Sequence, residues 1–235
     1  IFEVHFIHDT VTVDPEDPDP KKPNDPINPD DPDSPKYPSQ DDLSEKITRN
    51  IYVDGDLKAK QPVTYVRNET IDKVTGKVLR HSDWRLGKDS KDSWAEYDPD
   101  IAEGHHISSI TKDPDGKSNY EDVVSKDQNL TGVAPKKLNP KTDQNEDVYI
   151  HTAANEAHAK ISYIDDTLDA QHSLLKTDTD NGQGKYEDKI TFTEDPAEVI
   201  KEYEAKGYKL NTDHKDNFDP KASHTYGLKD EDNIS

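Results

Sequence analysis

The sequence predicts an elongated α+β fold, mainly β, in which two β-rich modules are joined to a polyproline II linker. Three observations favour this class. Proline recurs at every third position from residue 20 to residue 38. Short apolar runs alternate with polar residues, as in half-buried strands, and one segment carries the start and stop signals of a helix. We expect four segments, at residues 1–13, 14–42, 43–150 and 151–235.

The linker is the proline-rich segment, residues 14–42. Polyproline II has three residues per turn and rises about 3.1 Å per residue, so the spacing predicts a semi-rigid rod. Acidic residues between the prolines, among them Asp30, Asp31 and Asp33, repel one another and would extend the rod further. The segment is therefore interpreted as a spacer that holds folded modules apart.

Strands are predicted on both sides of the rod. Residues 1–8 place Phe2, Val4 and Phe6 on one face of an amphipathic strand, and we expect residues 11–13 to extend it. After the rod, strands are predicted at residues 47–53, 61–70, 77–84, 159–165, 186–193 and 208–210. We expect the first three of these to belong to an antiparallel module of four or more strands, with a hairpin turn at residues 54–56.

The helix is predicted after the strand at residues 186–193. Asp195 can cap its first turn, Pro196 suits the first helical position, and Glu198 completes a capping box. Gly207 supplies the left-handed residue that ends it. The second module thus has the order strand, strand, helix, strand, and a β-grasp fold needs one further strand.

Composition excludes several function classes. Only 29% of the residues are apolar, 34% are charged and the net charge is −21, so the cores are small. Nucleic-acid binding needs clustered Lys and Arg, and no basic patch is found. No apolar run approaches the roughly 20 residues that span a bilayer, so we expect no membrane insertion. No nucleophile–base pair or phosphate-binding loop is found, and we expect neither an enzyme nor a cofactor.

Metal binding is the one cofactor question that the sequence leaves open. Asp113, Asp115, Asn119 and Glu121 surround Gly116 with part of the rhythm of a Ca²⁺ loop. The third acidic ligand and the spacing of the final glutamate are missing, so a solvated turn is the preferred interpretation and Ca²⁺ the alternative. The ten histidines are interpreted as structural or surface residues.

Ligand binding is expected at the densest aromatic cluster, which comprises Trp84, Trp94 and Tyr97. Exposed aromatic faces stack on sugar rings, and carboxylates and amides nearby bind hydroxyl groups. Trp84, on a predicted strand, is interpreted as a core residue. Trp94, in a polar loop, is the better candidate.

Six stretches carry a resemblance to a known family: residues 26–38, 46–53, 63–67, 72–78, 159–166 and 203–208. They resemble the mucus-binding (Mub) repeats of lactobacillus surface adhesins. The first resembles the proline-rich segment of the repeat, and the next three are similar to its B2 module. The last two are similar to its B1 (MucBP-type) module, which is of the β-grasp or ubiquitin-like type. The sequence departs from the family at residues 167–170, where Thr-Leu-Asp-Ala replaces the usual turn.

The resemblance implies a fold and a function. Residues 43–150 would form a B2-like module, and residues 151–235 a B1-like module without its last strand. Residues 1–13 would close such a module, in a neighbouring repeat or in their own chain. The function implied is that of a repeat of a cell-wall-anchored bacterial adhesin, outside the cell, that binds mucin glycoproteins and their glycans. An immunoglobulin-binding surface module and a passive stalk remain the alternatives.

Overall fold

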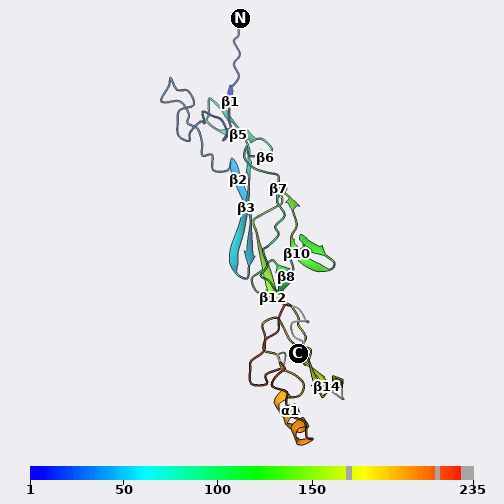
Figure 1. Ribbon diagram of the computed structural model, residues 1–235. Coiled ribbons are helices and arrows are strands. Elements are labelled where there is room, and N and C mark those ends of the chain that lie inside the picture. The colour runs from blue at the N-terminus through cyan, green and yellow to red at the C-terminus, as the bar shows by residue number, and fades with distance from the viewer. Residues whose placement is uncertain (168–170, 215–217, 229–235) are drawn as a thin grey trace. The chain divides into compact units, whose positions relative to one another are not determined.

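The structure is a computed structural model that describes residues 1–167, 171–214 and 218–228 (Figure 1). The chain divides into two compact units. The first comprises Ile1–Pro99 and Ser109–His151, and the second comprises Asp100–Ser108 and Thr152–Ser235. The described residues are mostly β, with the single short helix α1, and none of their helices has the length and apolar character needed to cross a bilayer. The predicted fold class, mainly β with some α, is therefore confirmed.

A five-stranded sheet is the largest element. Its order is β6-β3-β2-β12-β8, and the strands are β6 (Arg85–Leu86), β3 (Asp56–Val66), β2 (Ser44–Val53), β12 (Glu146–Ala154) and β8 (His105–Thr111). β2 and β3 form the predicted hairpin, because Asp54 and Gly55 both adopt positive φ, 48° and 88°. Two positive values are what a two-residue turn matched to the strand twist requires.

The centre of this sheet is parallel, which the sequence analysis did not predict. β12 pairs with β2 in parallel, in a register that runs from Glu146↔Arg49 to Ile150↔Val53. The prediction of an antiparallel module is therefore right for the hairpin and wrong for this central pair. Alternation of apolar and polar residues shows that a strand has a buried face, but it carries no information on the direction of its partner.

Two small two-stranded sheets complete the second half of the first unit. β9 (Val123–Lys126) pairs with β10 (Asn129–Val133), and β7 (Ser93–Trp94) pairs with β11 (Lys136–Lys137), both antiparallel. Both pairs lie in the stretch from residue 87 to residue 147, where the apolar pattern is weakest.

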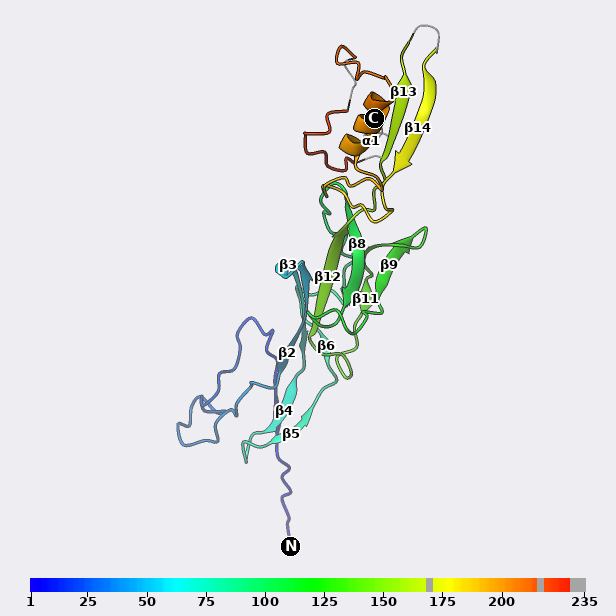
Figure 2. The same ribbon diagram turned by 90° about the horizontal axis from the view of Figure 1, so that it is seen from below.

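A three-stranded sheet forms the other part of the first unit (Figure 2). Its order is β1-β4-β5, with β1 (Thr10–Val13), β4 (Glu69–Asp72) and β5 (Val78–His81). The predicted strand at residues 61–70 is split between β3 and β4. The break is at Arg67, whose N–H donates to the carbonyl of Leu43 (3.0 Å) instead of to a β-ladder, so the chain passes there from one sheet to the other.

The prediction of a polyproline II rod is wrong, because the chain folds back on itself within the proline-rich segment. The N–H groups of Asn24, Ile27 and Tyr37 donate to the carbonyls of Tyr37, Pro35 and Asp25 at 2.8–3.0 Å. A polyproline II helix makes no such internal hydrogen bonds. Figure 2 shows the segment as a long loop near β4 and β5.

Burial of two apolar side chains explains the fold-back. Ile27 and Tyr37 are 8% and 6% exposed and join a core cluster with Val13, Leu43 and Ile71. Burying each of these side chains stabilises the folded-back segment by about 1.5–3 kcal/mol. In a solvated rod both side chains would stay exposed to water. The prolines therefore serve as turn residues with a fixed φ.

Residues 1–8 form no strand in this chain and are exposed. β1 begins only at Thr10, and it pairs with β4 in the first unit, from Thr10↔Asp72 to Val13↔Glu69. The version of the prediction in which residues 1–13 close a module of their own chain is therefore wrong. Alternation makes residues 1–8 competent to form a strand, but a strand also needs a partner edge. Closure of a neighbouring repeat stays a prediction.

The second unit contains an antiparallel pair and the helix. β13 (Lys160–Asp165) pairs with β14 (Ser173–Thr179), and α1 spans Pro196–Ala205. The predicted strand at residues 159–165 is thus confirmed. Those at residues 186–193 and 208–210 are wrong, because the first of these ranges makes only isolated bridges, such as Lys189↔Thr225, and the second is irregular. Of the predicted departure at residues 167–170, residues 168–170 lie outside the described residues.

The helix begins and ends as predicted. The Asp195 carboxylate accepts from the N–H of Ala197 at 2.9 Å, Pro196 is the first helical residue, and Gly207 has a φ of 100°. The capping box does not form, because the Glu198 carboxylate pairs with Lys201 at 2.6 Å. One side-chain acceptor therefore caps the first turn.

Replacing this acceptor should weaken the helix measurably. Asp195→Ala is expected to lower the stability of α1 by about 1 kcal/mol, whereas Asp195→Asn retains an acceptor oxygen and should cost much less. Amide hydrogen exchange of residues 196–205 measures the difference. Equal protection in the two variants would show that the cap contributes nothing.

Candidate functional site

Trp94 is buried, contrary to the prediction that it lies in an exposed loop. It is 1% exposed and belongs to a core cluster with Ile47, Val63, Tyr65 and Leu138. Its ring lies under the Arg49 guanidinium, with the carbon of that group 5.3 Å from the ring centroid. A covered ring cannot stack on a ligand, so the assignment of Trp94 as a ligand-binding residue is wrong.

Trp84 and Tyr97, the other two predicted ligand residues, are half-buried. Trp84 packs against the same core cluster, and its ring is covered by the Arg67 guanidinium at 4.6 Å. Tyr97 exchanges backbone hydrogen bonds with Val133 at 2.9 Å in both directions. The structure therefore shows no shared aromatic surface made by the three residues, and a binding role for Trp84 or Tyr97 stays a prediction.

The predicted Ca²⁺ residues lie in the turn after β8. The Asp113 carboxylate accepts from the N–H groups of Lys117 and Ser118 at 2.9 and 2.8 Å, and these bonds hold the pKa of Asp113 below its ordinary value. Asp115 pairs with Lys117, and Glu121 pairs with Lys112. Asn119 forms an isolated bridge with Thr111. These contacts are those of a solvated turn, the preferred interpretation above.

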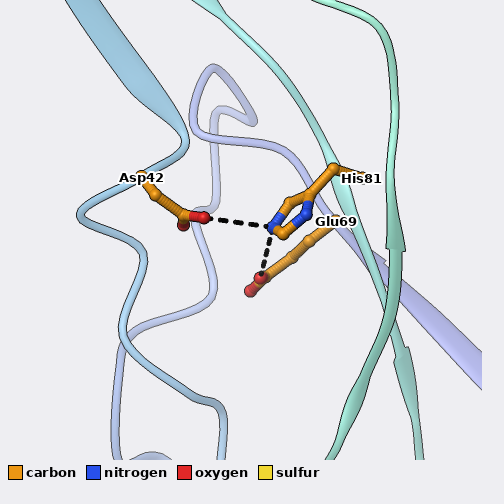
Figure 3. Close-up of side chains that lie close together, drawn as sticks. All are labelled: Asp42, Glu69 and His81. Carbon is orange, nitrogen blue, oxygen red and sulfur yellow. Dashed lines mark ion pairs between the residues drawn. The ribbon is translucent and has the colours of Figure 1, made fainter.

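Three other titratable side chains meet in the first unit (Figure 3). His81 Nε2 lies 3.3 Å from Asp42 Oδ2 and 3.8 Å from Glu69 Oε2. In Figure 3 the two carboxylates approach the imidazole from different segments of the chain. We call Asp42, Glu69 and His81 the carboxylate–histidine group.

Burial makes this group unusual. The Glu69 side chain is 1% exposed, and its Oε1 has no hydrogen-bond partner among the described residues. Burial, together with the charge of Asp42, raises the pKa of Glu69, and the positive charges of His81 and Arg67 oppose that rise. Arg67 donates to the carbonyl oxygen of Asp42 at 2.9 Å and to its Oδ2 at 2.8 Å.

The sequence does not reveal this group, because its members are far apart along the chain. Glu69 and His81 become neighbours through the register of β4 and β5. Asp42 comes close to them through the pairing of β2 with β3, in which Ser44 pairs with Val66 and the Arg67 N–H donates to the Leu43 carbonyl. A glutamate at a position that alternation assigns to the buried face of a strand was the one available signal.

A second polar network lies in the second unit, around Asp180. This side chain is 3% exposed, and its Oδ2 accepts from the N–H of Ala159 at 2.7 Å and from the Tyr226 hydroxyl at 2.8 Å. Oδ1 accepts from the N–H of Gly182 at 3.0 Å. Burial acts to raise the pKa of Asp180, but these hydrogen bonds, with the charge of His158, hold it below its ordinary value. The carboxylate thus ties together three segments of the unit.

Three tyrosines form an aromatic patch where β13 meets the end of α1. The rings of Tyr163 and Tyr203 are stacked with centroids 6.2 Å apart, and Tyr208 meets Tyr203 edge-on at 5.6 Å. Burial raises the pKa of Tyr163 to about 12, whereas Tyr208 is 41% exposed. We call Tyr163, Tyr203 and Tyr208 the tyrosine patch. Its outer member offers a partly open ring to a ligand.

Comparisons with known proteins find a family match within the second unit. Residues 157–232 match a family profile described as "Mucin binding domain". No curated protein matches the chain significantly. Two solved structures are similar. The first is described as "Crystal structure of Mub-RV". It is 14% identical to this chain and has a TM-score of 0.37, and the alignment covers 63% of this chain and 61% of that chain.

The second solved structure is "Type 2 repeat of the mucus binding protein MUB from Lactobacillus reuteri". It is 16% identical and has a TM-score of 0.32, and the alignment covers 62% of this chain and 59% of that chain. The chain thus spans about three fifths of each of these structures. The profile match covers the Asp180 network and the tyrosine patch. By this match, residues 157–232 are similar to the mucin-binding domain family.

Proposed function

We propose that the chain is a mucus-binding repeat of a bacterial surface adhesin that attaches to the glycans of mucin. The observation that carries the proposal is the match of residues 157–232 to the mucin-binding domain. Attachment to mucus from a cell-wall anchor, outside the cell, is the setting in which such a repeat would act. We propose binding as the role of the chain, and no catalysis.

Mucin is a multivalent surface, and a repeat suits it for a physical reason. A single module with one partly exposed aromatic contact binds weakly. Linked copies raise the effective concentration of the second contact, and overall avidity can exceed the affinity of one module by orders of magnitude. Neighbouring repeats are therefore part of the proposal, as is closure of the next module by residues 1–8.

The tyrosine patch is the surface that we assign to glycan contact. Tyrosine combines an apolar ring with a polar tip, and a sugar ring presents C–H bonds on one face and hydroxyl groups at its edge. Tyr208 leaves part of its ring open, and the Lys206 ammonium lies 4.7 Å from the Tyr203 ring centroid. A cation at this position would favour the acidic sugars of mucin.

Mucin binding before and after enzymatic removal of its glycans tests the function. We expect the full chain to bind immobilised mucin and to lose the signal after deglycosylation. Binding that survives on the stripped protein would contradict glycan recognition. Binding to deglycosylated immunoglobulin, with none to mucin, would favour the alternative of an immunoglobulin-binding module. Absence of binding to either would favour a passive stalk.

A single substitution tests the site. Tyr208→Ala should weaken mucin binding about fivefold or more, because truncation of an aromatic contact residue commonly costs more than about 1 kcal/mol. Tyr52→Ala is the matched control, since Tyr52 is also part of a tyrosine pair (4.8 Å from Tyr149) but lies outside the matched segment. Biolayer interferometry on immobilised mucin measures both. Equal loss in the two variants would rule out the tyrosine patch as the site.

A further inference from the structure

The carboxylate–histidine group is fixed by the backbone on which its members stand. Glu69 is the first residue of β4 and His81 the last of β5, and the two are direct cross-strand partners. Asp42 precedes Leu43, which is fully buried. The Arg67 guanidinium holds the Asp42 carboxylate and packs on the Trp84 ring. The backbone thus brings the three residues together, and Arg67 holds the Asp42 carboxylate in place.

Their donor atoms lie close enough together to serve as a set of metal ligands. The three donor atoms lie within 4.8 Å of one another, and Nε2 of His81 is 3.3 Å from the Asp42 oxygen. Around a tetrahedral Zn²⁺ with bonds of about 2.0–2.1 Å, neighbouring ligand atoms are about 3.3 Å apart. The His81–Glu69 separation of 3.8 Å needs only a small side-chain rotation to reach this value.

The buried carboxylate supplies an independent observation that points to a ligand. A carboxylate oxygen that is removed from water and has no hydrogen-bond donor is costly. Glu69 Oε1 is in this state, and His81 approaches the other oxygen of the same carboxylate. A cation bound between the three side chains would neutralise the charge of the buried Glu69 carboxylate.

We propose that Asp42, Glu69 and His81 bind one divalent transition-metal cation of the Zn²⁺ class. The donor set selects this class, because Ca²⁺ and Mg²⁺ prefer all-oxygen ligands, whereas an imidazole nitrogen with carboxylates suits Zn²⁺. Three protein ligands leave a further position for water. Arg67 then acts as an outer-shell residue that orients Asp42, since a carboxylate oxygen has two lone pairs and can accept from Arg67 while it binds a metal.

The site would cross-link parts of the first unit that are distant in the sequence. Residue 42 follows the proline-rich fold-back, and residues 69 and 81 are the paired ends of β4 and β5. A cation there ties the three-stranded sheet to the start of β2. The metal would therefore stabilise the folded first unit, in proportion to its free concentration relative to its dissociation constant.

Competition of the full chain with a zinc-binding dye tests the proposal. We expect one equivalent of Zn²⁺ to bind, an excess of Ca²⁺ not to displace it, and Zn²⁺ to raise the melting temperature. Asp42→Asn and His81→Gln should each weaken Zn²⁺ binding by at least about tenfold, the smallest loss usual even for outer-shell partners, and should abolish the rise. Glu69→Gln should do the same.

His8→Gln is the matched control. His8 Nδ1 pairs with Asp72 Oδ2 at 2.8 Å, so it is also a histidine beside a carboxylate of the same three-stranded sheet. Among the described residues, however, it has only this one carboxylate partner. This variant should bind Zn²⁺ as the unaltered chain does. A loss equal to that of His81→Gln, unchanged binding in Asp42→Asn and His81→Gln, or no binding to the unaltered chain would each overturn the proposal. Asp42 is exposed, so Asp42→Asn decides the question if circular dichroism shows Glu69→Gln to be unfolded.

Discussion

Trp94→Ala is expected to lower the free energy of unfolding of the first unit by about 3–5 kcal/mol, the usual cost of truncating a buried tryptophan to alanine. The side chain is 1% exposed and packs among Ile47, Val63, Tyr65 and Leu138. Its removal leaves a cavity at the side of β2 and β3. It also takes the ring away from the Arg49 guanidinium, which is itself fully buried. Urea denaturation followed by far-UV circular dichroism measures the loss.

Trp84→Ala is the matched control for this prediction. Trp84 packs against the same cluster from a half-buried position, so its truncation should cost less than that of Trp94. Both tryptophans of the chain lie in the first unit, and each variant therefore keeps one fluorescent reporter of that unit. A Trp94→Ala protein that unfolds at the same urea concentration as the unaltered chain would contradict the assignment of Trp94 to the core.

The burial of Trp94 could not be predicted from the local sequence. Trp94 follows Lys91, Asp92 and Ser93, a polar stretch that is typical of an exposed loop. It is buried because the two-residue strand β7 pairs with β11, more than forty residues later in the sequence. Such short strands have no periodicity to detect, so the burial of Trp94 could not be predicted from its neighbours.

The proline-rich segment shows a related limit. Proline spacing fixes φ at each proline but leaves the residues between them free. The segment folds back because Ile27 and Tyr37 pack in an apolar cluster with Val13 and Ile71. By contrast, the helix was predicted to within a residue at each end, because Asp195, Pro196 and Gly207 act locally. Signals that act within one turn were readable from the sequence, whereas long-range burial was not.

The candidate metal site depends on both kinds of information. The pairing of Glu69 with His81 needs a hairpin whose turn, around Gly76, the sequence does indicate. The position of Asp42 follows from the β2–β3 hairpin, in which Ser44 pairs with Val66. The sequence predicts this hairpin but does not indicate that the chain passes from β3 to β4 at Arg67. Alternation places residue 69 on the buried face of β4, where the structure has it. A charged residue is unexpected on a buried face, which normally carries apolar side chains. Such conflicts between local pattern and chemistry occur most often at functional sites.

Asp180→Ala is expected to destabilise the second unit by roughly 3–5 kcal/mol. The substitution leaves the Ala159 N–H and the Tyr226 hydroxyl buried without an acceptor, and each such group costs about 1–3 kcal/mol. Ala159 and Tyr226 are 4% and 3% exposed and belong to the core cluster of this unit, so water cannot replace the carboxylate. Under the proposed function, mucin binding should also fall with the stability of this unit.

The measurement can separate the two units. Both tryptophans lie in the first unit, so their fluorescence transition in urea should shift less in Asp180→Ala than the loss of amide hydrogen-exchange protection in residues 157–167 and 171–179 implies. Asp188→Asn is the control, since it removes the same charge from an exposed side chain near Tyr226. Retained protection in residues 157–167 and 171–179 of Asp180→Ala would contradict the assignment.

Acid should also destabilise the second unit of the unaltered chain, because it protonates the Asp180 carboxylate. The pKa of Asp180 lies below its ordinary value of 3.8 in the folded unit, so the unfolded chain binds this proton more readily. The contribution of Asp180 to stability is then fully present above about pH 4 and is lost as the pH falls through its depressed folded pKa. Asp180→Asn cannot titrate, and its second unit should therefore be less stable at pH 7 but less sensitive to acid below pH 4. Parallel acid profiles of the two proteins would show that another carboxylate governs the acid stability of this unit.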